Sequence, residues 1–343
     1  MNRSFDHATV LVTGGTGSFG STVVEYLLGK ACREIRIFSR DETKQDDMRN
    51  RLAGRGNVRY FLGDVRDRTS VDRVMPGVDV VFHAAALKQV PSCEFFPLEA
   101  VATNVLGSSH VIDSAVAHRV GTVVLLGTDK AVYPVNAMGM TKALMEKVGQ
   151  ATARELALNG ATTTVCSVRY GNVLHSRGSV VPAFVQQLKR GEPLAVTEPT
   201  MTRFLLPLSQ AVDLVEFAMA NGENGDVFIR KAPASTIGDL AQAVQNIFGR
   251  QVGTKVIGVR HGEKLYETLA SRQELRQAED FGNYYRVRMD DRDLNYALYF
   301  SEGDTEVAPM DDYHSHNTRR LTLPQVEELL LGLPEIQAEL SSW

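Results

Sequence analysis

The chain of 343 residues is long enough to bury a large core and to hold two modest domains or one elaborated one. Hydrophobic residues make up 43% and charged residues 23%, as in an ordinary globular protein. The formal charge of −4 excludes the broad basic field that nucleic acid or an anionic membrane would need. Any phosphate group must therefore be bound locally, by a loop and a few arginines.

Cysteine usage and hydropathy indicate a cytoplasmic protein. The three cysteines are isolated and lack metal-ligand spacing, and Cys166 lies in an apolar run that predicts a buried strand residue. Residues 1–6 are too polar for a signal peptide, and no apolar run approaches the length of a membrane span. No metal site is expected, because no carboxylate or cysteine framework surrounds the pair His314 and His316.

Short apolar runs alternate with helical patterns over the first half of the chain. Segments between the runs place apolar residues at helical spacing. Continuous apolar strands that alternate with helices indicate a doubly wound parallel sheet of the Rossmann type, an α/β fold. The predicted strands are Thr9–Thr13, Glu34–Phe38, Val58–Leu62, Val78–His83, Thr122–Leu126 and Thr163–Val168.

The pattern changes after about Asn172. Gly, Pro and basic residues cluster in two stretches between 175 and 203, where we expect loops and short helices. We assign residues 1–172 to a dinucleotide-binding domain, to which a strand near 225–231 returns. Residues 173–343 are assigned mainly to a smaller substrate-binding domain and a C-terminal segment. That domain would close over the carboxyl ends of the strands, where open α/β sheets bind ligands.

A glycine-rich loop follows the first predicted strand and precedes a helical pattern. Its three glycines form a G-x-x-G-x-x-G pattern that allows a tight turn, a close approach of backbone to a pyrophosphate, and helix–strand packing. The helix N-terminus then faces the phosphates. In this context the pattern predicts a nicotinamide dinucleotide site. The expected contacts are Thr13, Gly14, Thr16, Gly17, Ser18, Phe19 and Gly20.

The end of the second strand bears on which dinucleotide is bound. An NAD site usually places a carboxylate there, which accepts hydrogen bonds from the ribose 2′-hydroxyl. This chain places Ser39 and Arg40 there, with Lys44 one helical turn beyond. A hydroxyl and a guanidinium suit a 2′-phosphate. Asp41 is the opposing observation, but we expect it to cap the next helix. NADP is therefore predicted in preference to NAD.

Two further groups of cofactor contacts are expected at the next strand ends. Asp64 and Val65 follow the third strand, where the carboxylate is placed to contact the adenine. Ala84, Ala85 and Ala86 end the fourth strand, and their small side chains would let the backbone approach the cofactor.

These features, together with Asn104, resemble the extended short-chain dehydrogenase/reductases over most of the chain. That family carries a Ser or Thr at the end of strand five and Tyr-x-x-x-Lys on the next helix. Thr128 fills the hydroxyl position and Lys142 the lysine position, whereas Met138 stands where the tyrosine is expected. A thioether has no proton to exchange, so Met138 cannot be the base of a hydride transfer. By resemblance, Asn104 and Lys142 contact the cofactor.

Asp129 and Lys130 stand side by side at the end of the fifth strand. An acid and a base there are costly unless they are used. The Thr-Asp-Lys-Ala run at 128–131, with Lys88 after the alanines, resembles the inverting UDP-N-acetylglucosamine 4,6-dehydratases. The Met-x-x-x-Lys variant resembles the capsule-biosynthesis branch of that group.

The resemblance implies a retained NADP that takes a hydride from C4 of the sugar and returns it to C6. Lys130 would remove the C5 proton, and Asp129, with its pKa raised by burial, would protonate the hydroxyl that leaves C6 as water. Lys142 would bind the nicotinamide ribose, and Thr128 would hydrogen-bond the C4 oxygen. The acceptor of the C4-hydroxyl proton stays open among Lys142, Lys130 through water, and Tyr133.

Substrate contacts are expected on both sides of the domain boundary. The late segments 260–267 and 316–321 resemble the same branch, and two arginines would serve the diphosphate while a carboxylate serves a ribose hydroxyl. By resemblance, Asn172 would contact the diphosphate, with two further residues near the uridine. The expected contacts of UDP-N-acetylglucosamine are Lys88, Asn172, Ser179, Val180, Arg203, Arg260 and Glu263.

Two other functions remain open at this point. A UDP-sugar epimerase acting at C4, or at C5 and C3, would begin with the same oxidation. A cofactor-binding regulator could have lost catalysis with its tyrosine, although Asp129 and Lys130 argue against that reading. Members of the family are commonly hexameric, so the resemblance also implies a homo-oligomer.

Overall fold

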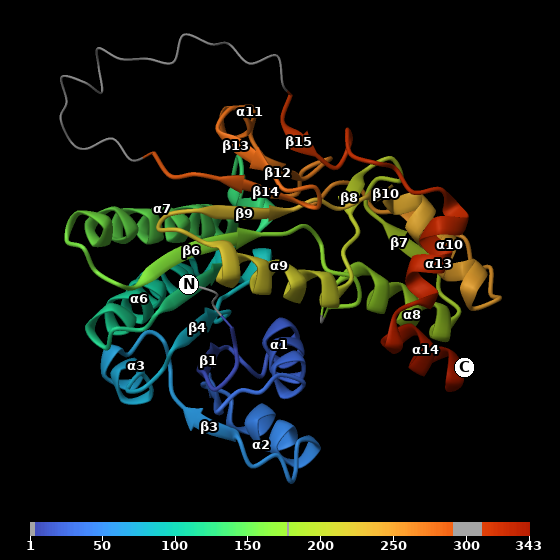
Figure 1. Ribbon diagram of the computed structural model, residues 1–343. Helices are drawn as coiled ribbons and strands as arrows, with labels where there is room; N and C mark the ends of the chain where they lie inside the picture. The colour runs from blue at the N-terminus through green and yellow to red at the C-terminus, as the bar shows by residue number, and fades with distance from the viewer. Residues whose placement is uncertain (1–3, 177, 291–310) are drawn as a thin grey trace.

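A nine-stranded sheet runs through the larger body of the molecule (Figure 1). The structure is a computed structural model that describes residues 4–176, 178–290 and 311–343. The strand order is β13-β14-β9-β6-β5-β4-β1-β2-β3, and the seven strands from β9 to β3 are parallel. The predicted doubly wound α/β fold is therefore confirmed. The parallel strands are β1 (Thr9–Thr13), β2 (Glu34–Ser39), β3 (Val58–Leu62), β4 (Val80–His83), β5 (Thr122–Leu126), β6 (Thr164–Arg169) and β9 (Val227–Arg230).

Helices cover both faces of this sheet (Figure 1). One face packs against α1 (Ser18–Leu28), α2 (Glu42–Arg51) and α9 (Leu208–Asn221). The other packs against α3 (Arg68–Val74), α6 (Gly107–Ala117) and α7 (Ala137–Leu158). Between β4 and α6 the chain forms the short helices α4 (Val90–Phe95) and α5 (Pro97–Ala100) and the π-helical turn η1 (Val101–Leu106).

Strand β1 shows why the parallel strands are continuous apolar runs. Val10 and Val12 pack into the core on the α1 and α9 side, whereas Leu11 packs into the core on the α3 and α6 side. Successive strand residues point to opposite faces, so a sheet covered twice needs apolar residues at every position. Each such side chain stabilises the fold by roughly 1.5–3 kcal/mol through its burial. Cys166 of β6 is likewise buried, as predicted.

The sheet is completed by a hairpin that the sequence pattern did not reveal. Strands β13 (Ala278–Asp280) and β14 (Tyr284–Val287) pair with each other and extend β9 antiparallel. Arg286 in β14 bonds the buried Asp226, which directly precedes β9. This long-range ion pair fixes the hairpin to the edge of the parallel sheet.

A smaller lobe, at the right of Figure 1, has a hydrophobic core of its own. Phe184, Leu240 and Leu330 are buried at its centre. Its helices are α8 (Val180–Arg190), α10 (Ile237–Ile247), α13 (Leu323–Leu331) and α14 (Pro334–Ser341). Two strand pairs lie in or next to it: β7 (Leu194–Val196) with β11 (Thr254–Val256), and β8 (Thr202–Phe204) with β10 (Ala234–Thr236). The pair β12 (Thr268–Ala270) with β15 (Tyr313–His314) and the helical turn α11 (Arg272–Leu275) share a hydrophobic cluster with β9 and β14 of the sheet.

The domain limits given above stay a prediction. Helix α9 and strands β9, β13 and β14 follow residue 172 and lie with the larger body. Residues 1–3 of the first predicted domain and 291–310 of the second lie outside the described residues.

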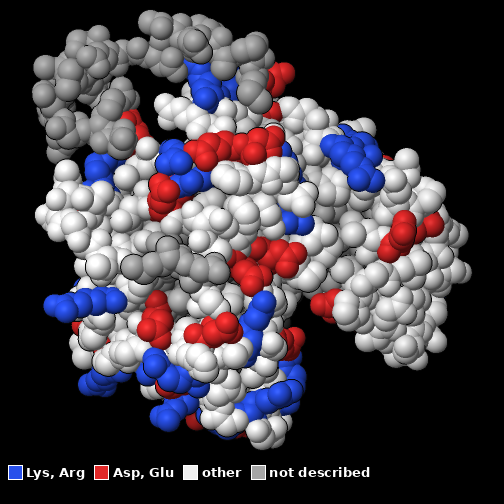
Figure 2. Space-filling view, in the orientation of Figure 1, with Lys and Arg blue, Asp and Glu red and all other residues white. Residues whose placement is uncertain are grey.

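The surface and the helices limit what the fold can contact. On the face drawn in Figure 2, acidic and basic side chains are interspersed, so this face carries no extended field of one sign. Within the described part of the chain, no helix is both long and apolar enough to cross a membrane. The same residues contain no cluster of three or more His, Cys, Asp or Glu side chains that could hold a metal ion.

Candidate active site

A cavity of about 480 Å³ lies at the carboxyl ends of the parallel strands. Its size is that of a typical ligand site. Residues that follow six different strands meet there, because the carboxyl ends of parallel strands share one edge of the sheet. The predicted site residues that line it are Gly14, Thr16, Gly17, Ser18, Phe19, Gly20, Ser39, Arg40, Lys44, Asp64, Val65, Ala84, Ala85, Ala86, Lys88, Thr128, Lys130, Met138 and Lys142.

The glycine loop has the geometry that a dinucleotide needs. Gly14 has φ +65°, and a Cβ atom there would lie 2.8 Å from the backbone of Ala85. A Cβ atom at Gly20 would lie 2.4 Å from the carbonyl oxygen of Gly14. Gly17 caps α1 without a side-chain hydrogen bond, which leaves the cap of this helix N-terminus to a phosphate. These residues fit the pyrophosphate of a nicotinamide cofactor.

The end of β2 places a guanidinium at the cavity. Arg40 lines it with its side chain 54% exposed, and its Nη1 atom lies 3.6 Å from Asp64 Oδ2. Asp41 accepts a hydrogen bond from the backbone N–H of Lys44 and caps α2, as expected. The Ser39 hydroxyl accepts a hydrogen bond from Gln45. Arg40, directly after β2, therefore places a cation at the cavity that suits a further phosphate.

Two predicted cofactor residues support the loop after β4 instead of lining the cavity. The Thr13 hydroxyl contacts His83 Nδ1 at 2.8 Å and accepts a hydrogen bond from the backbone of Ala85. Asn104 is fully buried and bonds both the N–H and the carbonyl of Leu87. Both side chains fix the backbone that forms this wall. Burial lowers the pKa of His83 to about 3, so this histidine is neutral.

The acid and the base follow β5 on a short 3₁₀ turn, η2 (Asp129–Ala131). Lys130 lines the cavity, whereas Asp129 is 1% exposed and lies behind it. Lys130 Nζ donates to Asp129 Oδ1 at 3.0 Å, and the Thr128 hydroxyl donates to the same oxygen at 2.8 Å. Helix α7 can approach this turn because Gly139 has no side chain: a Cβ atom there would lie 2.2 Å from the Lys130 carbonyl oxygen.

Lys142 lies on the same wall, one helical turn after Met138. Its Nζ atom donates to the Leu126 carbonyl at 2.7 Å. Burial lowers the pKa of Lys142 to about 8, although the charge of Glu146 opposes this. A substantial fraction of this amine is therefore neutral near pH 8 and able to take a proton. Tyr133 is half-exposed, and its hydroxyl donates to Gln273 and Asp312 away from the cavity lining.

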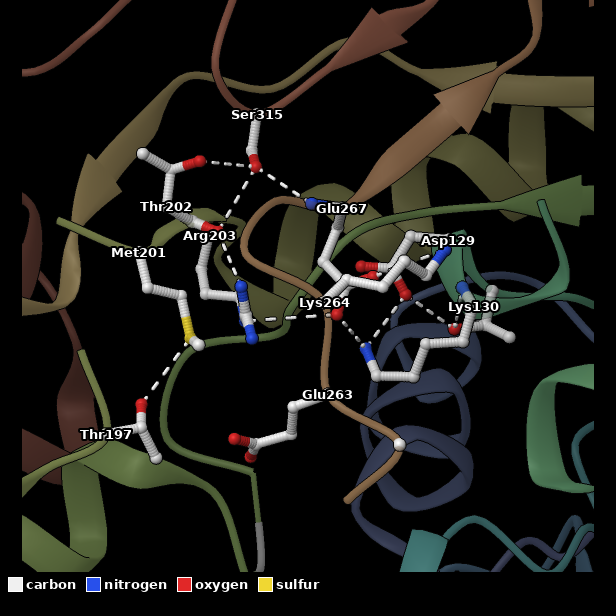
Figure 3. Close-up of polar contacts among 12 residues, drawn as sticks. Asp129, Lys130, Thr197, Met201, Thr202, Arg203, Glu263, Lys264, Glu267 and Ser315 are labelled. Atoms are coloured by element: carbon white, nitrogen blue, oxygen red, sulfur yellow. Dashed lines mark hydrogen bonds and ion pairs between the residues drawn. The ribbon is translucent and has the colours of Figure 1, made fainter. Parts of the chain in front are cut away.

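Sequence reasoning missed Glu267, whose carboxylate lies at the buried side of Lys130 (Figure 3). Its Oε1 atom is 3.2 Å from Lys130 Nζ, and its side chain is 3% exposed. Arg203 and Lys264 lie 3.8 and 3.9 Å from the same carboxylate. Glu267 was part of the late segment 260–267, but no spacing rule connects it with a residue 137 positions earlier.

Tyr170 is a second residue that sequence reasoning did not single out. It lines the cavity directly after β6 and stacks on Phe19, with ring centroids 5.6 Å apart. Nothing in its local pattern marks it, since an aromatic residue after a strand is more often part of a core.

The predicted substrate residues are not all brought to the cavity. Among the described residues, the Asn172 side-chain oxygen and the Ser179 hydroxyl are buried without a hydrogen-bond partner. Arg260 and Glu263 lie on the surface and pair with each other, 4.0 Å apart. Of the predicted substrate contacts, Lys88 lines the cavity. The others do not line it: Asn172, Ser179, Val180, Arg203, Arg260 and Glu263.

The sheet, the glycine loop and the positions of Thr128 and Lys142 define an extended short-chain dehydrogenase/reductase with methionine in the tyrosine position. The chain belongs to the polysaccharide biosynthesis protein family, whose profile matches residues 10–289. A second profile, polysaccharide biosynthesis protein C-terminal, matches residues 290–337.

Known relatives match over nearly the whole chain. A Rickettsia canadensis protein named UDP-glucose 4-epimerase is 55% identical over 342 residues, which span 98% of this chain and 99% of that protein. The X-ray structure of Pen from Bacillus thuringiensis is 32% identical with a TM-score of 0.86, covering 95% of this chain and 98% of Pen. DesIV, a dTDP-glucose 4,6-dehydratase from Streptomyces venezuelae, is 22% identical with a TM-score of 0.68, covering 75% and 86%, a likeness of fold alone.

Substitution of Gly20 by Ala should weaken dinucleotide binding at least about tenfold, because the added Cβ atom would collide with the Gly14 carbonyl and displace the loop. Fluorescence titration with NADPH and with NADH measures the effect. Gly56→Ala is the matched control, since a Cβ atom there meets no described atom within 4 Å. Equal affinities for the two variants would contradict the assignment of the loop.

Proposed function

We propose that this protein is a nicotinamide-dependent UDP-N-acetylglucosamine 4,6-dehydratase that inverts C5. Its product would be a UDP-2-acetamido-2,6-dideoxy-4-keto-hexose for capsule or O-antigen polysaccharide. The observation that carries the proposal is the Asp129–Lys130 pair beside the cavity. Dehydration needs a base for the C5 proton and an acid for the C6 hydroxyl, whereas a change at C4 alone needs neither.

The side chains divide the proton transfers among them. A bound nicotinamide would supply the hydride acceptor and donor. Lys142 takes the C4-hydroxyl proton, because its pKa of about 8 leaves neutral amine at the cavity. Thr128 hydrogen-bonds the C4 oxygen. Lys130 removes the C5 proton, which the adjacent ketone has made acidic, and Asp129 protonates the departing C6 hydroxyl.

The unpartnered polar atoms beyond β6 support a nucleotide-sugar substrate. Asn172 and Ser179 each bury an oxygen that lacks a hydrogen-bond partner in the described chain, and such a group is costly unless a ligand satisfies it. We assign Asn172 to the diphosphate, and Ser179 with Val180 to the uridine. Arg260 and Glu263 would have to move towards the cavity to complete this site.

A UDP-sugar 4-epimerase is the second candidate, because the Rickettsia relatives at 53–55% identity carry the name UDP-glucose 4-epimerase. Such an enzyme shares the oxidation at C4, for which Lys142 and Thr128 suffice. It leaves the Asp129–Lys130 pair without a task at C5 and C6. We therefore favour the dehydratase.

We further propose NADP as the cofactor. Arg40 presents its guanidinium to the cavity, and Asp41 is engaged in capping α2. A guanidinium recognises a 2′-phosphate through charge-assisted hydrogen bonds. DesIV, in contrast, was solved with NAD bound.

A homo-oligomer is supported by an apolar surface on the segment 90–106 and the first turns of α7, which pack together. Such a group of large apolar side chains marks an interaction surface in a folded protein. Because the elements that carry these side chains pack against one another, we propose that a second copy of the chain covers them. The exposed side chains are Phe95, Phe96, Leu98, Leu106, Met140 and Leu144.

UDP-N-acetylglucosamine that carries deuterium at C4 should give a product with deuterium at C6, because the hydride taken from C4 returns to C6. Lys130→Ala should abolish product formation while NADPH binding persists, since the base is lost and the glycine loop is intact. NMR of the product and fluorescence titration measure the two results. The exposed Lys147 of α7 supplies the control variant, Lys147→Ala. Deuterium returned to C4 would establish the epimerase, and substantial dehydratase activity in Lys130→Ala would overturn the base assignment.

Arg40→Ala should weaken NADP⁺ binding about tenfold more than NAD⁺ binding, because one charge-assisted hydrogen bond contributes about 1.5–3 kcal/mol. Isothermal titration of both dinucleotides measures the ratio. Arg49→Ala on α2, which removes an arginine paired with Asp46, is the control. Tighter binding of NAD⁺ than NADP⁺ by the unmodified protein would refute the cofactor proposal.

Leu98→Glu should lower the molar mass found by light scattering, because a carboxylate at a side chain that is 79% exposed would be buried in the proposed interface. Leu158→Glu changes an equally exposed leucine at the far end of α7 and should leave the mass unaltered. A monomeric parent protein, or an unchanged mass for Leu98→Glu, would contradict this interface.

A further inference from the structure

The segment from Arg260 to Glu267, here called the strap, brings a carboxylate to Lys130 from outside the Rossmann sheet (Figure 3). The reaction scheme above assigns this carboxylate no task. Glu267 is nevertheless buried nearly as completely as Asp129, and it contacts the proposed base directly. Burial of a carboxylate costs free energy, and its negative charge shifts the pKa of an ammonium that it contacts.

We propose that Glu267 is a positioning residue that holds the Lys130 ammonium at the cavity and sets the pH at which this amine can accept a proton. The role in C5 deprotonation rests on the proposed function, whereas the effect on Lys130 itself does not. Glu267 acts through Lys130 and is not assigned a contact with substrate.

Two carboxylates contact the ammonium nitrogen of Lys130. Lys130 Nζ lies 3.0 Å from Asp129 Oδ1 and 3.2 Å from Glu267 Oε1. The Lys130 side chain is 23% exposed, on the cavity side. The second oxygen of each carboxylate, Asp129 Oδ2 or Glu267 Oε2, is buried and lacks a hydrogen-bond partner among the described residues. Both carboxylates therefore direct their charge at the ammonium with little solvent between.

Hydrogen bonds fix the strap both at Lys264 and at Glu267. Lys264 Nζ donates to the Val132 carbonyl at 2.7 Å, which ties the strap to the turn that carries the acid and the base. The backbone N–H of Glu267 donates to the Ser315 hydroxyl at 3.0 Å. That hydroxyl also contacts the Thr202 hydroxyl at 2.8 Å (Figure 3). Glu267 is thus fixed by three separate segments, as a positioning residue requires.

The charges that face Lys130 come from every neighbouring element: Asp129 on its own turn, Glu267 and Lys264 on the strap, and Arg203 on β8. Burial works to lower the pKa of Lys130, and the two carboxylates outweigh it, so the pKa is raised overall. Lys130 is consequently an ammonium in the free protein.

An ammonium must lose a proton before it can remove one from C5. Transfer from Lys130 Nζ to Asp129 Oδ1, along their hydrogen bond, leaves a neutral amine and a protonated carboxyl group. The amine then takes the C5 proton while the electron pair moves towards the C4 ketone, and the carboxyl group protonates the leaving C6 hydroxyl. Lys130 and Asp129 return to their starting charges. The remaining negative charge, on Glu267, decides how readily the first transfer occurs.

Glu267→Gln should lower the pKa of Lys130, because it removes one negative charge while it keeps the size of the side chain. The shift should be about one to three pH units. NMR titration of the lysine ε-methylene groups in the isolated protein measures it, and the signal that vanishes in Lys130→Arg identifies the residue. Because the scheme above needs one proton on the Lys130–Asp129 pair, activity is lost when Lys130 gives its proton to solvent. The basic limb of the kcat profile should therefore move to lower pH by a similar amount, with little change in KM.

Asp226→Asn is the matched control, because it removes a buried carboxylate that pairs with Arg286 far from Lys130. It should leave the Lys130 titration unchanged. Identical Lys130 titrations in the parent protein and in folded Glu267→Gln would overturn the proposal. Should that variant fail to fold, Glu267→Asp retracts the charge by one methylene, and a titration identical to the parent's would overturn it equally. Absence of turnover by the parent protein would reject the dehydratase alone, since the NMR titration needs no substrate.

Discussion

The catalytic half of the structure depends on one constraint: the ammonium group of Lys130 is held largely out of water. An ion removed from water needs a compensating charge and hydrogen bonds, or it changes its protonation state. Asp129 supplies one partner from the same turn, and Glu267 supplies the other from a segment that follows most of the sheet. The turn after β5, the strap and the segment around Ser315 must therefore assemble together for one nitrogen to be held at the cavity.

The two lysines on this wall show how position separates their chemistry. Lys130 meets two carboxylates, so its pKa is raised against burial. Among the described residues, Lys142 has only a carbonyl and a thioether at hydrogen-bond distance, and its pKa is lowered to about 8. Groups whose surroundings push their pKa values apart can act as acid and base in one site. Lys142 is accordingly suited to the C4 hydroxyl at the start of a cycle. Lys130 is suited to a step that begins with an internal transfer to Asp129.

The parts of the fold that local patterns determine were predictable from the sequence. The six strands of the first half have bounds within two residues of those in the structure, because each is an apolar run that two helical layers must cover. The glycine loop and the i, i+4 pair of Met138 and Lys142 could likewise be predicted, because a single turn or helix fixes their spacing. Most of the residues predicted from these local patterns line one cavity.

What the sequence left hidden depends on contacts between distant segments. The hairpin of β13 and β14 needs the Arg286–Asp226 pair, and Asn104 supports a loop 17 residues earlier in place of lining the cavity. Glu267 was visible only as one acid in a charged segment. Its role depends on the 3.2 Å distance between its Oε1 atom and Lys130 Nζ, a contact between segments far apart in the sequence.

Replacement of the family's tyrosine by Met138 ties these observations together. Where a tyrosine stands, it can exchange the C4-hydroxyl proton, and the lysine one helical turn later can remain an ammonium. Met138 exchanges no proton, so that task falls to a neighbouring group that is partly neutral near physiological pH. Lys142 meets this requirement because it is buried beside the Leu126 carbonyl, and no carboxylate in the described part of the chain hydrogen-bonds it. The loss of the tyrosine therefore does not require the loss of catalysis. In the proposed mechanism the first proton passes to Lys142, and the Asp129–Lys130–Glu267 group would act at C5 and C6.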